Sequence, residues 1–308
     1  MEQHRLLNRL KKTDFPWMYE VSKCAPQEAL RDLDKAFKNF FEGRANFPKF
    51  KKKGIGDSFR LTGTIKVFPK HVQLPRLGKI RVKETAKCKG RILSATVSRE
   101  ADRWYVSLAV EMEIPDPLPV QGGLVGIDRG LTHFAVLSTG EKVEAPKSLA
   151  ENLKKLRRLS RQLSRRQKGS NNRRKAALRL ARLHRKIKNQ RKDFLHKLST
   201  RVAKTKPVIV VEDLAVKNMV RNKRLSRNIA DAGWREFQRM LAYKTKWYGS
   251  RLVVAPKFYP SSRMCSECGY VLPELGLSTR HWVCPECGAI HDRDINAAVN
   301  LLQYLNSA

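Results

Sequence analysis

The spacing of hydrophobic residues changes along the chain, and each change predicts a different kind of structure. Within residues 1–56, Leu30, Leu33 and Phe37 recur at intervals of three and four, so they fall on one face of a helix. We predict a helical segment here, and packing against the next part of the chain is its simplest role.

Residues 57–118 show the alternation of apolar and polar residues that is typical of β-strands. Trp104, Val106 and Leu108 share one face of a strand, because successive side chains point to opposite faces. Several short strands with turns between them predict a small antiparallel β-barrel or sandwich, and we take the β-barrel as our prediction. Nucleic-acid binding and a purely structural role are both open for such a barrel.

A second domain is predicted over residues 122–260, and it opens with a buried strand that carries an acid. Val125 and Ile127 are the apolar neighbours of Asp128 in this strand. An ionised carboxylate among apolar residues costs free energy unless a partner compensates its charge. A salt bridge is the ordinary compensation for a single acid, whereas several acids placed alike favour a metal ion.

A basic helical hairpin is predicted as an insertion at residues 150–205. Residues 151–206 contain 22 lysines and arginines but only two acids, and leucines at helical spacing on both sides of Gly169 predict two antiparallel helices. A run of charge usually marks a solvated face, but a run with so few acids repels itself unless a polyanion neutralises it. The residues that we assign to nucleic-acid contact are Arg173, Arg174, Lys175, Arg182, Arg185 and Lys186.

The overall composition supports a nucleic-acid partner. The formal net charge is +36, and hydrophobic residues make up 41% of the chain, which indicates a globular protein with a strong positive field. A membrane surface could attract the same field, but the sequence has no signal peptide, lipidation motif or long apolar run. We therefore predict no membrane partner. Four of the six cysteines look metal-bound and the other two are isolated in the sequence, which predicts a reducing, cytoplasmic environment.

Three further acids lie where they could join Asp128. Glu212 ends a second apolar strand, and the carboxyl ends of strands are where sheets collect active-site residues. Asp292 and Asp294 precede a run of helix-forming residues near the end of the chain. We expect Asp128, Glu212 and Asp294 to converge on Mg²⁺, a hard cation that prefers oxygen ligands. Two such ions roughly 4 Å apart can activate a water and stabilise the leaving 3′ oxygen of a phosphodiester.

Four cysteines have the spacing of a zinc ribbon at residues 261–290. Cys265 and Cys268 are followed, after 15 intervening residues, by Cys284 and Cys287. Each pair can offer two thiolates to one tetrahedral zinc ion, whereas four buried thiols or two disulfides are the less favoured alternatives. Because cysteine fills all four positions, this zinc would be structural.

Together these segments predict an α+β protein. An N-terminal helix and a small antiparallel β-barrel precede an RNase H-like domain. The basic hairpin and the zinc ribbon interrupt that domain, and a final helix at residues 291–308 completes it.

Five motifs, in order, resemble those of the TnpB family. These are the OrfB proteins of insertion sequences, similar to the nuclease half of type V CRISPR effectors. The motifs are GIDRGL, VVEDLAV, DAGWREFQRMLAYKTKWYG, YPSSRMCSECG and CPECGAIHDRDINAAVNLL. The resemblance implies a transposon-encoded, RNA-guided DNA endonuclease with a RuvC-type domain, in the cytoplasm of a prokaryote and on the nucleoid when bound to DNA. Its expected partners are a guide RNA from the transposon end and a double-stranded DNA target. Its expected cofactors are structural Zn²⁺ and a pair of catalytic Mg²⁺ ions.

The resemblance also assigns roles to residues. The family's three catalytic acids fall on Asp128, Glu212 and Asp294, and Asp292 becomes an accessory residue. Residues 1–56 become a recognition segment, and the barrel becomes wedge-like. Family members usually begin with a further strand and helix, so we expect a shortened N-terminus beside an intact active site. A non-catalytic RNA-guided DNA-binding protein and an inactive, truncated transposon copy are the alternatives.

Overall fold

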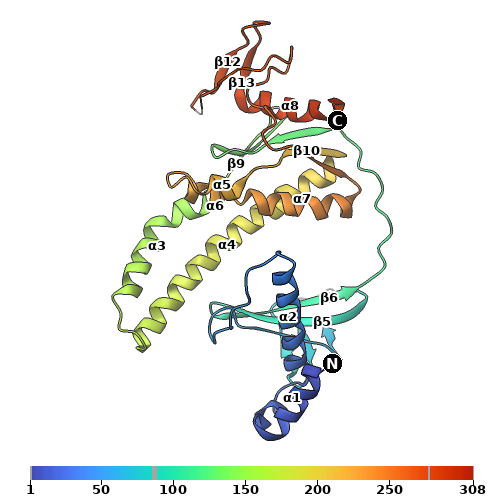
Figure 1. Cartoon of the computed structure of the whole chain (residues 1–308), viewed down its shortest axis with the longest axis vertical. Helices are drawn as coiled ribbons and strands as arrows, with labels where there is room; N and C mark the ends of the chain where they lie inside the picture. Colours follow the sequence, from blue (N-terminus) through green and yellow to red (C-terminus); the bar gives the residue numbers. More distant parts are fainter. Residues whose placement is uncertain (1, 85–88, 277, 308) are drawn as a thin grey trace. The chain divides into compact units, whose positions relative to one another are not determined.

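The computed structural model describes residues 2–84, 89–276 and 278–307. The chain divides into two compact units, Met1–Ile114 and Pro115–Ala308 (Figure 1). The first unit begins with α1 (Glu2–Thr13), the short 3₁₀ helix η1 (Pro16–Tyr19) and α2 (Cys24–Phe41). The predicted helix is therefore present as α2. Its apolar stripe is only partly covered, since Leu33 is 43% exposed.

Two antiparallel sheets of three strands each follow in the first unit. One has the order β1 (Ser58–Leu61), β5 (Arg91–Glu100), β6 (Arg103–Glu111), and the other has the order β2 (Lys66–Phe68), β3 (His71–Leu74), β4 (Gly78–Arg81). Both sheets contribute to one core that includes Leu61, Val72 and Ala95. The prediction of a β-barrel is wrong for the described residues, which form no closed barrel. Alternation along a strand reveals that one face is covered, but it does not reveal which strands pair.

The second unit is built on a five-stranded mixed sheet with the order β11–β10–β7–β8–β9. The parallel strands are β7 (Val125–Asp128), β10 (Val208–Glu212) and β11 (Arg251–Ala255). The strands that run antiparallel to their neighbours are β8 (His133–Leu137) and β9 (Lys142–Glu144). The sheet places the ends of β7 and β10 side by side.

Helices cover both faces of this sheet. Val125, Ile127 and Ile209 belong to a core with side chains of α4 (Asn171–Thr205) and α7 (Trp234–Tyr248). On the opposite face, Val210 is buried with Leu301 of α8 (Arg293–Ser307). Because side chains alternate along a strand, the residues of β7 and β10 that face α8 are those next to the ones in the larger core.

The predicted helical hairpin is present as α3 (Ser148–Ser164) and α4. Leu159, Leu183 and Ile187 are buried between the two helices, which extend away from the sheet (Figure 1). Gly169 turns the chain with a φ of +86°, a conformation open to glycine. Ser170 then caps α4 by accepting a hydrogen bond from the Arg173 backbone N–H at 3.2 Å.

The remaining elements lead to the C-terminal helix. The helices α5 (Val216–Met219) and α6 (Ser226–Ala232) connect β10 to α7, and the strands β12 (His281–Val283) and β13 (Ile290–Asp292) precede α8. Within the three described ranges, no helix is both long enough and apolar enough to cross a bilayer.

Candidate active site and zinc site

Two of the predicted acids lie side by side at the carboxyl ends of neighbouring parallel strands. Val211 of β10 pairs with Ile127 of β7, so the next residues along the two strands, Glu212 and Asp128, lie opposite each other. Both acids lie on the sheet face that α8 covers, because each is two residues after a residue of that face, Val210 or Gly126. The strand register therefore brings these two carboxylates together.

The third predicted acid, Asp294, reaches the same place through the packing of α8. Gly126 has no side chain, and a Cβ there would collide with the backbone of Ala298, so α8 lies directly on β7. Asp294 is four residues before Ala298, a displacement of about 6 Å along a helix. Asp128 is two residues after Gly126, a displacement of about 6.6 Å along a strand. The two steps match if helix and strand run in opposite directions, and the charge of Asp294 does act on the Asp128 carboxyl.

The negative charges of the acids are only partly compensated by the protein itself. Burial, followed by the charges of Asp294 and Glu212, raises the pKa of Asp128 to about 7. Burial also raises the pKa of Glu212, and the neighbouring Asp213 adds to this shift. Carboxylates that are buried and crowded together favour protonation, or a bound metal ion that replaces the proton.

Arg129 is a buried cation behind this cluster that the sequence analysis missed. Its guanidinium donates to the backbone carbonyl of Glu212, and it lies 3.4 Å from the carbonyl of Trp234 and 3.3 Å from Oε1 of Gln238 in α7. Burial lowers the pKa of Arg129 to about 10. The positive charge of Arg129 opposes the rise in the pKa values of Asp128 and Glu212 but does not cancel it. Arg129 thus joins the ends of β7 and β10 from the face opposite α8. The sequence signal that could have identified Arg129 is its position directly after an acid at the end of an apolar strand.

Asp292 has a different role from Asp294, because it caps α8. Its Oδ1 accepts hydrogen bonds from the backbone N–H groups of Asp294 at 3.0 Å and Ile295 at 3.1 Å, and Lys142 donates to its Oδ2 at 2.6 Å. Burial acts to raise the pKa of Asp292, but these donors outweigh burial and lower it. Asp294 instead faces Arg280, 3.7 Å from its carboxylate. Asp292 therefore fixes the start of the helix that carries Asp294.

The four predicted zinc ligands form one cluster. The Sγ atoms of Cys265, Cys268, Cys284 and Cys287 all lie within 4.8 Å of one another, and two of the pairs are 3.6 Å apart. Thiolates about 2.3 Å from a tetrahedral zinc ion stand about 3.8 Å from each other, so the cluster fits zinc in both size and donor type. The buried ring of His291, whose Nε2 lies 3.1 Å from Sγ of Cys265, was not among the predicted residues.

Side chains of α8 hold the first cysteine pair against the helix. Nδ2 of Asn300 donates to the carbonyls of Ser261 at 2.8 Å and Met264 at 2.6 Å. Asn296 donates to the same Met264 carbonyl at 2.7 Å and accepts from the Ser266 backbone N–H at 3.0 Å. Both asparagines are buried, and the bonded backbone flanks Cys265. The helix that carries Asp294 is thus bound to one half of the zinc site.

The predicted nucleic-acid residues all lie on α4, and some of them also have structural partners. Arg173 donates to the carbonyls of Leu163 and Arg166 at 2.8 and 3.0 Å, so it closes the end of α3. Arg174 is 3.4 Å from Oδ1 of Asn171. Lys175 and Lys186 are exposed, as is Arg182, and Arg185 is half-buried. The group lies on α4, which extends with α3 away from the sheet (Figure 1), and four of its six side chains are exposed.

Comparison with known proteins finds relatives over nearly the whole chain. The OrfB_IS605 profile, described as a probable transposase, matches residues 107–223, and the Cas12f1-like TNB domain profile matches residues 234–301. The chain is 40% identical to a "Putative RNA-guided DNA endonuclease" of Streptomyces pristinaespiralis, over 96% of this chain and 75% of that protein. It is 39% identical to the "Putative RNA-guided DNA endonuclease InsQ" of Escherichia coli K12, over 94% of this chain and 76% of that protein.

A solved structure supports the fold. The cryo-EM structure of a Cas12f1–sgRNA–target DNA complex matches with a TM-score of 0.56 and 17% sequence identity. The match covers 97% of this chain and 75% of that one. At this identity the likeness concerns the arrangement of helices and strands.

Proposed function

This chain belongs to the OrfB_IS605, or TnpB, family of transposon proteins, and we propose that it is an RNA-guided DNA endonuclease that cuts through Asp128, Glu212 and Asp294. The observation that supports the proposal is the buried Asp128 at the carboxyl end of β7, whose pKa is raised to about 7 by burial and by the charges of Asp294 and Glu212. Arg129 compensates only part of this negative charge, and a divalent cation would supply both the remaining charge and the chemistry.

The three acids would hold Mg²⁺, because they offer only oxygen donors. When bound, two Mg²⁺ ions would activate a water molecule and stabilise the leaving 3′ oxygen of a phosphodiester. The residues of the chain provide the geometry. Parallel strands fix Asp128 and Glu212, α8 fixes Asp294, and Arg129 holds the two strand ends together. In the same proposal, Zn²⁺ at the four cysteines is structural and stabilises the loop that leads into α8.

A guide RNA and a double-stranded DNA target are the proposed partners. The net charge of +36 and the basic hairpin suit a polyanion such as RNA or DNA, because contacts between lysine or arginine side chains and phosphates supply much of the binding affinity. The names of the relatives describe RNA-guided DNA endonucleases, and the solved Cas12f1 complex contains a guide RNA and a target DNA. Guide pairing would select the target, and the basic surfaces of the protein would supply affinity.

The test is cleavage of a matched DNA target by the purified protein–RNA complex in Mg²⁺. Alanine at Asp128, Glu212 or Asp294 should each abolish cleavage and leave guide binding intact, since the three acids act as one site. Alanine at Glu141 is a matched control, because this exposed acid pairs with Arg201 outside the cluster. Wild-type cutting by any of the three variants would refute the site. No cutting by the wild-type complex with its guide and matched target would favour the non-catalytic alternative.

A further inference from the structure

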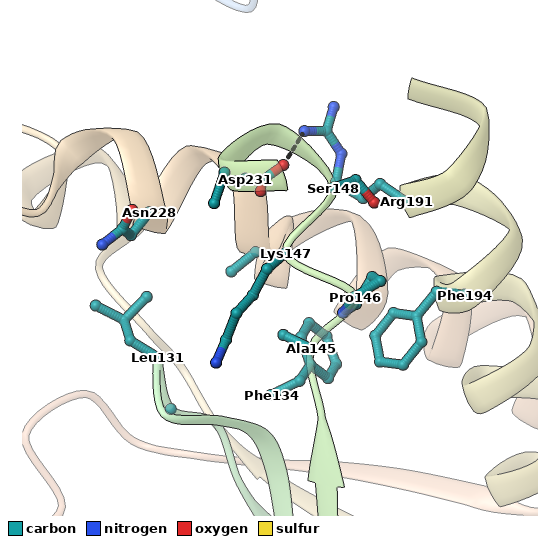
Figure 2. Close-up of a pocket in the computed structure, with 13 residues that line it drawn as sticks. Leu131, Phe134, Ala145, Pro146, Lys147, Ser148, Arg191, Phe194, Asn228 and Asp231 are labelled. Atoms are coloured by element: carbon teal, nitrogen blue, oxygen red, sulfur yellow. Dashed lines mark hydrogen bonds and ion pairs between the residues drawn. The ribbon is translucent and has the colours of Figure 1, made fainter. Parts of the chain in front are cut away.

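A small cavity lies beside the strand end that carries Asp128, and the proposed mechanism does not use it. Its volume is about 170 Å³ (Figure 2). Gly130, in the loop after β7, lines one side, and the other sides come from the segment before α3 and from α4 and α6. None of the three proposed catalytic acids lines the cavity.

The walls of the cavity are mainly apolar. Leu131, Phe134, Pro146 and Phe194 line it, and the two phenylalanine rings pack edge to face with centroids 5.0 Å apart. Sites for drug-sized ligands are usually about 300–1,000 Å³, so this cavity admits only a small group such as a single ring system. Apolar and aromatic walls of this kind receive the face of an unstacked nucleobase.

The polar side of the cavity is held in place before any ligand binds. Asp231 of α6 accepts a hydrogen bond from the Leu149 backbone N–H of α3 at 3.0 Å and pairs with Arg191 of α4 at 3.3 Å. Figure 2 shows the Asp231–Arg191 pair at the edge of the cavity. Because one carboxylate joins three helices, the cavity needs little reorganisation to accept a ligand.

Lys147 supplies an unneutralised positive charge. Its side chain extends across the cavity toward Leu131 (Figure 2). Its backbone has a φ of +44°, which is unfavourable for a residue with a Cβ and is often found at binding sites. In the part of the chain that the structure describes, no carboxylate lies within ion-pair distance of Lys147. The charge is therefore available to an anionic ligand.

We propose that this cavity binds one unpaired nucleotide, with its base between the apolar walls and its phosphate on Lys147. The cavity has room for one ring system, Lys147 can contact a phosphate, and the basic hairpin adjoins the cavity, so all three features suit a nucleotide. The inference rests on the proposed function only in that the partner is nucleic acid, and it does not require cleavage. The nucleotide can come from the guide RNA or from a DNA strand, and the experiment distinguishes these sources.

The experiment fills the cavity without changing charge. Ala150, an exposed residue in the first turn of α3, lines the cavity, so Ala150→Phe and the smaller Ala150→Leu should occupy the base position. Ala177→Phe, on an exposed part of α4, is the control for the added bulk. Binding is measured at several salt concentrations with labelled RNA recovered from the purified complex, and separately with labelled single-stranded DNA. A thermal melt of each variant checks that it is folded.

Filling the cavity should weaken binding of the strand that supplies the nucleotide by about 5- to 150-fold, the value of one base–aromatic stack. The dependence on salt should not change, because no charge is removed. Lys147→Gln should instead reduce the salt slope by about 0.7, the contribution of one phosphate of a single strand. Lys155→Gln, an exposed lysine of α3 outside the cavity, controls for general charge.

Two outcomes distinguish the failure of the nucleotide-binding cavity from the failure of the proposed nuclease function. If Ala150→Phe and Ala150→Leu bind both strands as tightly as Ala177→Phe, the cavity does not hold a nucleotide, even where the wild-type complex cleaves DNA. If the filled variants lose affinity for one strand while the wild-type complex fails to cleave, the cavity inference stands and the proposed nuclease function fails.

Discussion

Replacing Asn300 with alanine should loosen the first cysteine pair from α8 and so disturb Asp294. The side chain of Asn300 is fully buried, and its amide donates to the carbonyls of Ser261 and Met264. Alanine removes both donors. The Met264 carbonyl keeps its bond from Asn296, but the Ser261 carbonyl keeps only a 3.4 Å contact with that residue.

The expected size of the effect follows from these two bonds. Each net hydrogen bond contributes about 0.5–1.5 kcal/mol, so the free energy of unfolding should fall by about 1–3 kcal/mol. In a domain of 150–250 residues, each kcal/mol lowers Tm by about 2–4 °C. The second unit, Pro115–Ala308, should therefore melt about 2–12 °C lower. Loss of backbone contacts that orient Cys265 should also speed the release of zinc.

The assay combines three measurements on the protein–RNA complex. Thermal unfolding gives the stability, transfer of zinc to a chelating dye gives its release rate, and cleavage at varied Mg²⁺ gives the concentration for half-maximal activity. Asn300→Ala should release zinc faster and need more Mg²⁺, with guide binding unchanged. Asn306→Ala is the matched control, since Asn306 is exposed on the same helix. If Asn300→Ala melts lower but keeps wild-type zinc release and Mg²⁺ dependence, the asparagine only adds stability and does not position Asp294.

Three other predictions concern the ions and the basic surface. The folded, metal-free protein should retain the Asp128 proton up to about pH 7, whereas the unfolded chain loses it near 3.8, so this group's stabilising contribution falls as pH rises between those values. In the proposed site Mg²⁺ would bind the ionised form of Asp128, so the rise in Tm on adding Mg²⁺ should be larger at pH 8 than at pH 6 and absent in Asp128→Asn. Elemental analysis should find one zinc per chain, and Cys284→Ser should lower both zinc content and cleavage; zinc-free wild type prepared without chelator would contradict this. Replacing Arg174, Lys175 and Lys186 with glutamine should reduce the slope of log K against log salt concentration for duplex DNA binding by up to about 0.9 per replaced residue. An unchanged slope would mean that these side chains face solvent and do not contact phosphates.

The sequence identified the acids and cysteines of the candidate site more readily than the residues around them. Asp128 and Glu212 could be recognised because each ends an apolar strand, and the cysteines because their spacing suits one metal ion. Arg129 could not be placed, because its partners Glu212 and Trp234 lie 83 and 105 residues away and only the folded chain brings them together. The prediction of a β-barrel was wrong for a similar reason. The alternation of apolar and polar side chains along a strand does not show which strands of the first unit pair with each other.

The arrangement of the acids depends on residues that perform no chemistry. Gly126 allows α8 to touch β7, and this contact makes one helical turn match two residues of strand, so Asp294 reaches Asp128. Arg129 fixes the neighbouring strand ends from the other face, and the asparagines of α8 bind the loop that holds Cys265. A copy of this protein could thus keep every proposed ligand and still lose the geometry of the candidate site through a change at one of these supporting positions. The presence of the three acids and four cysteines is therefore not sufficient evidence of cleavage by a protein of this family.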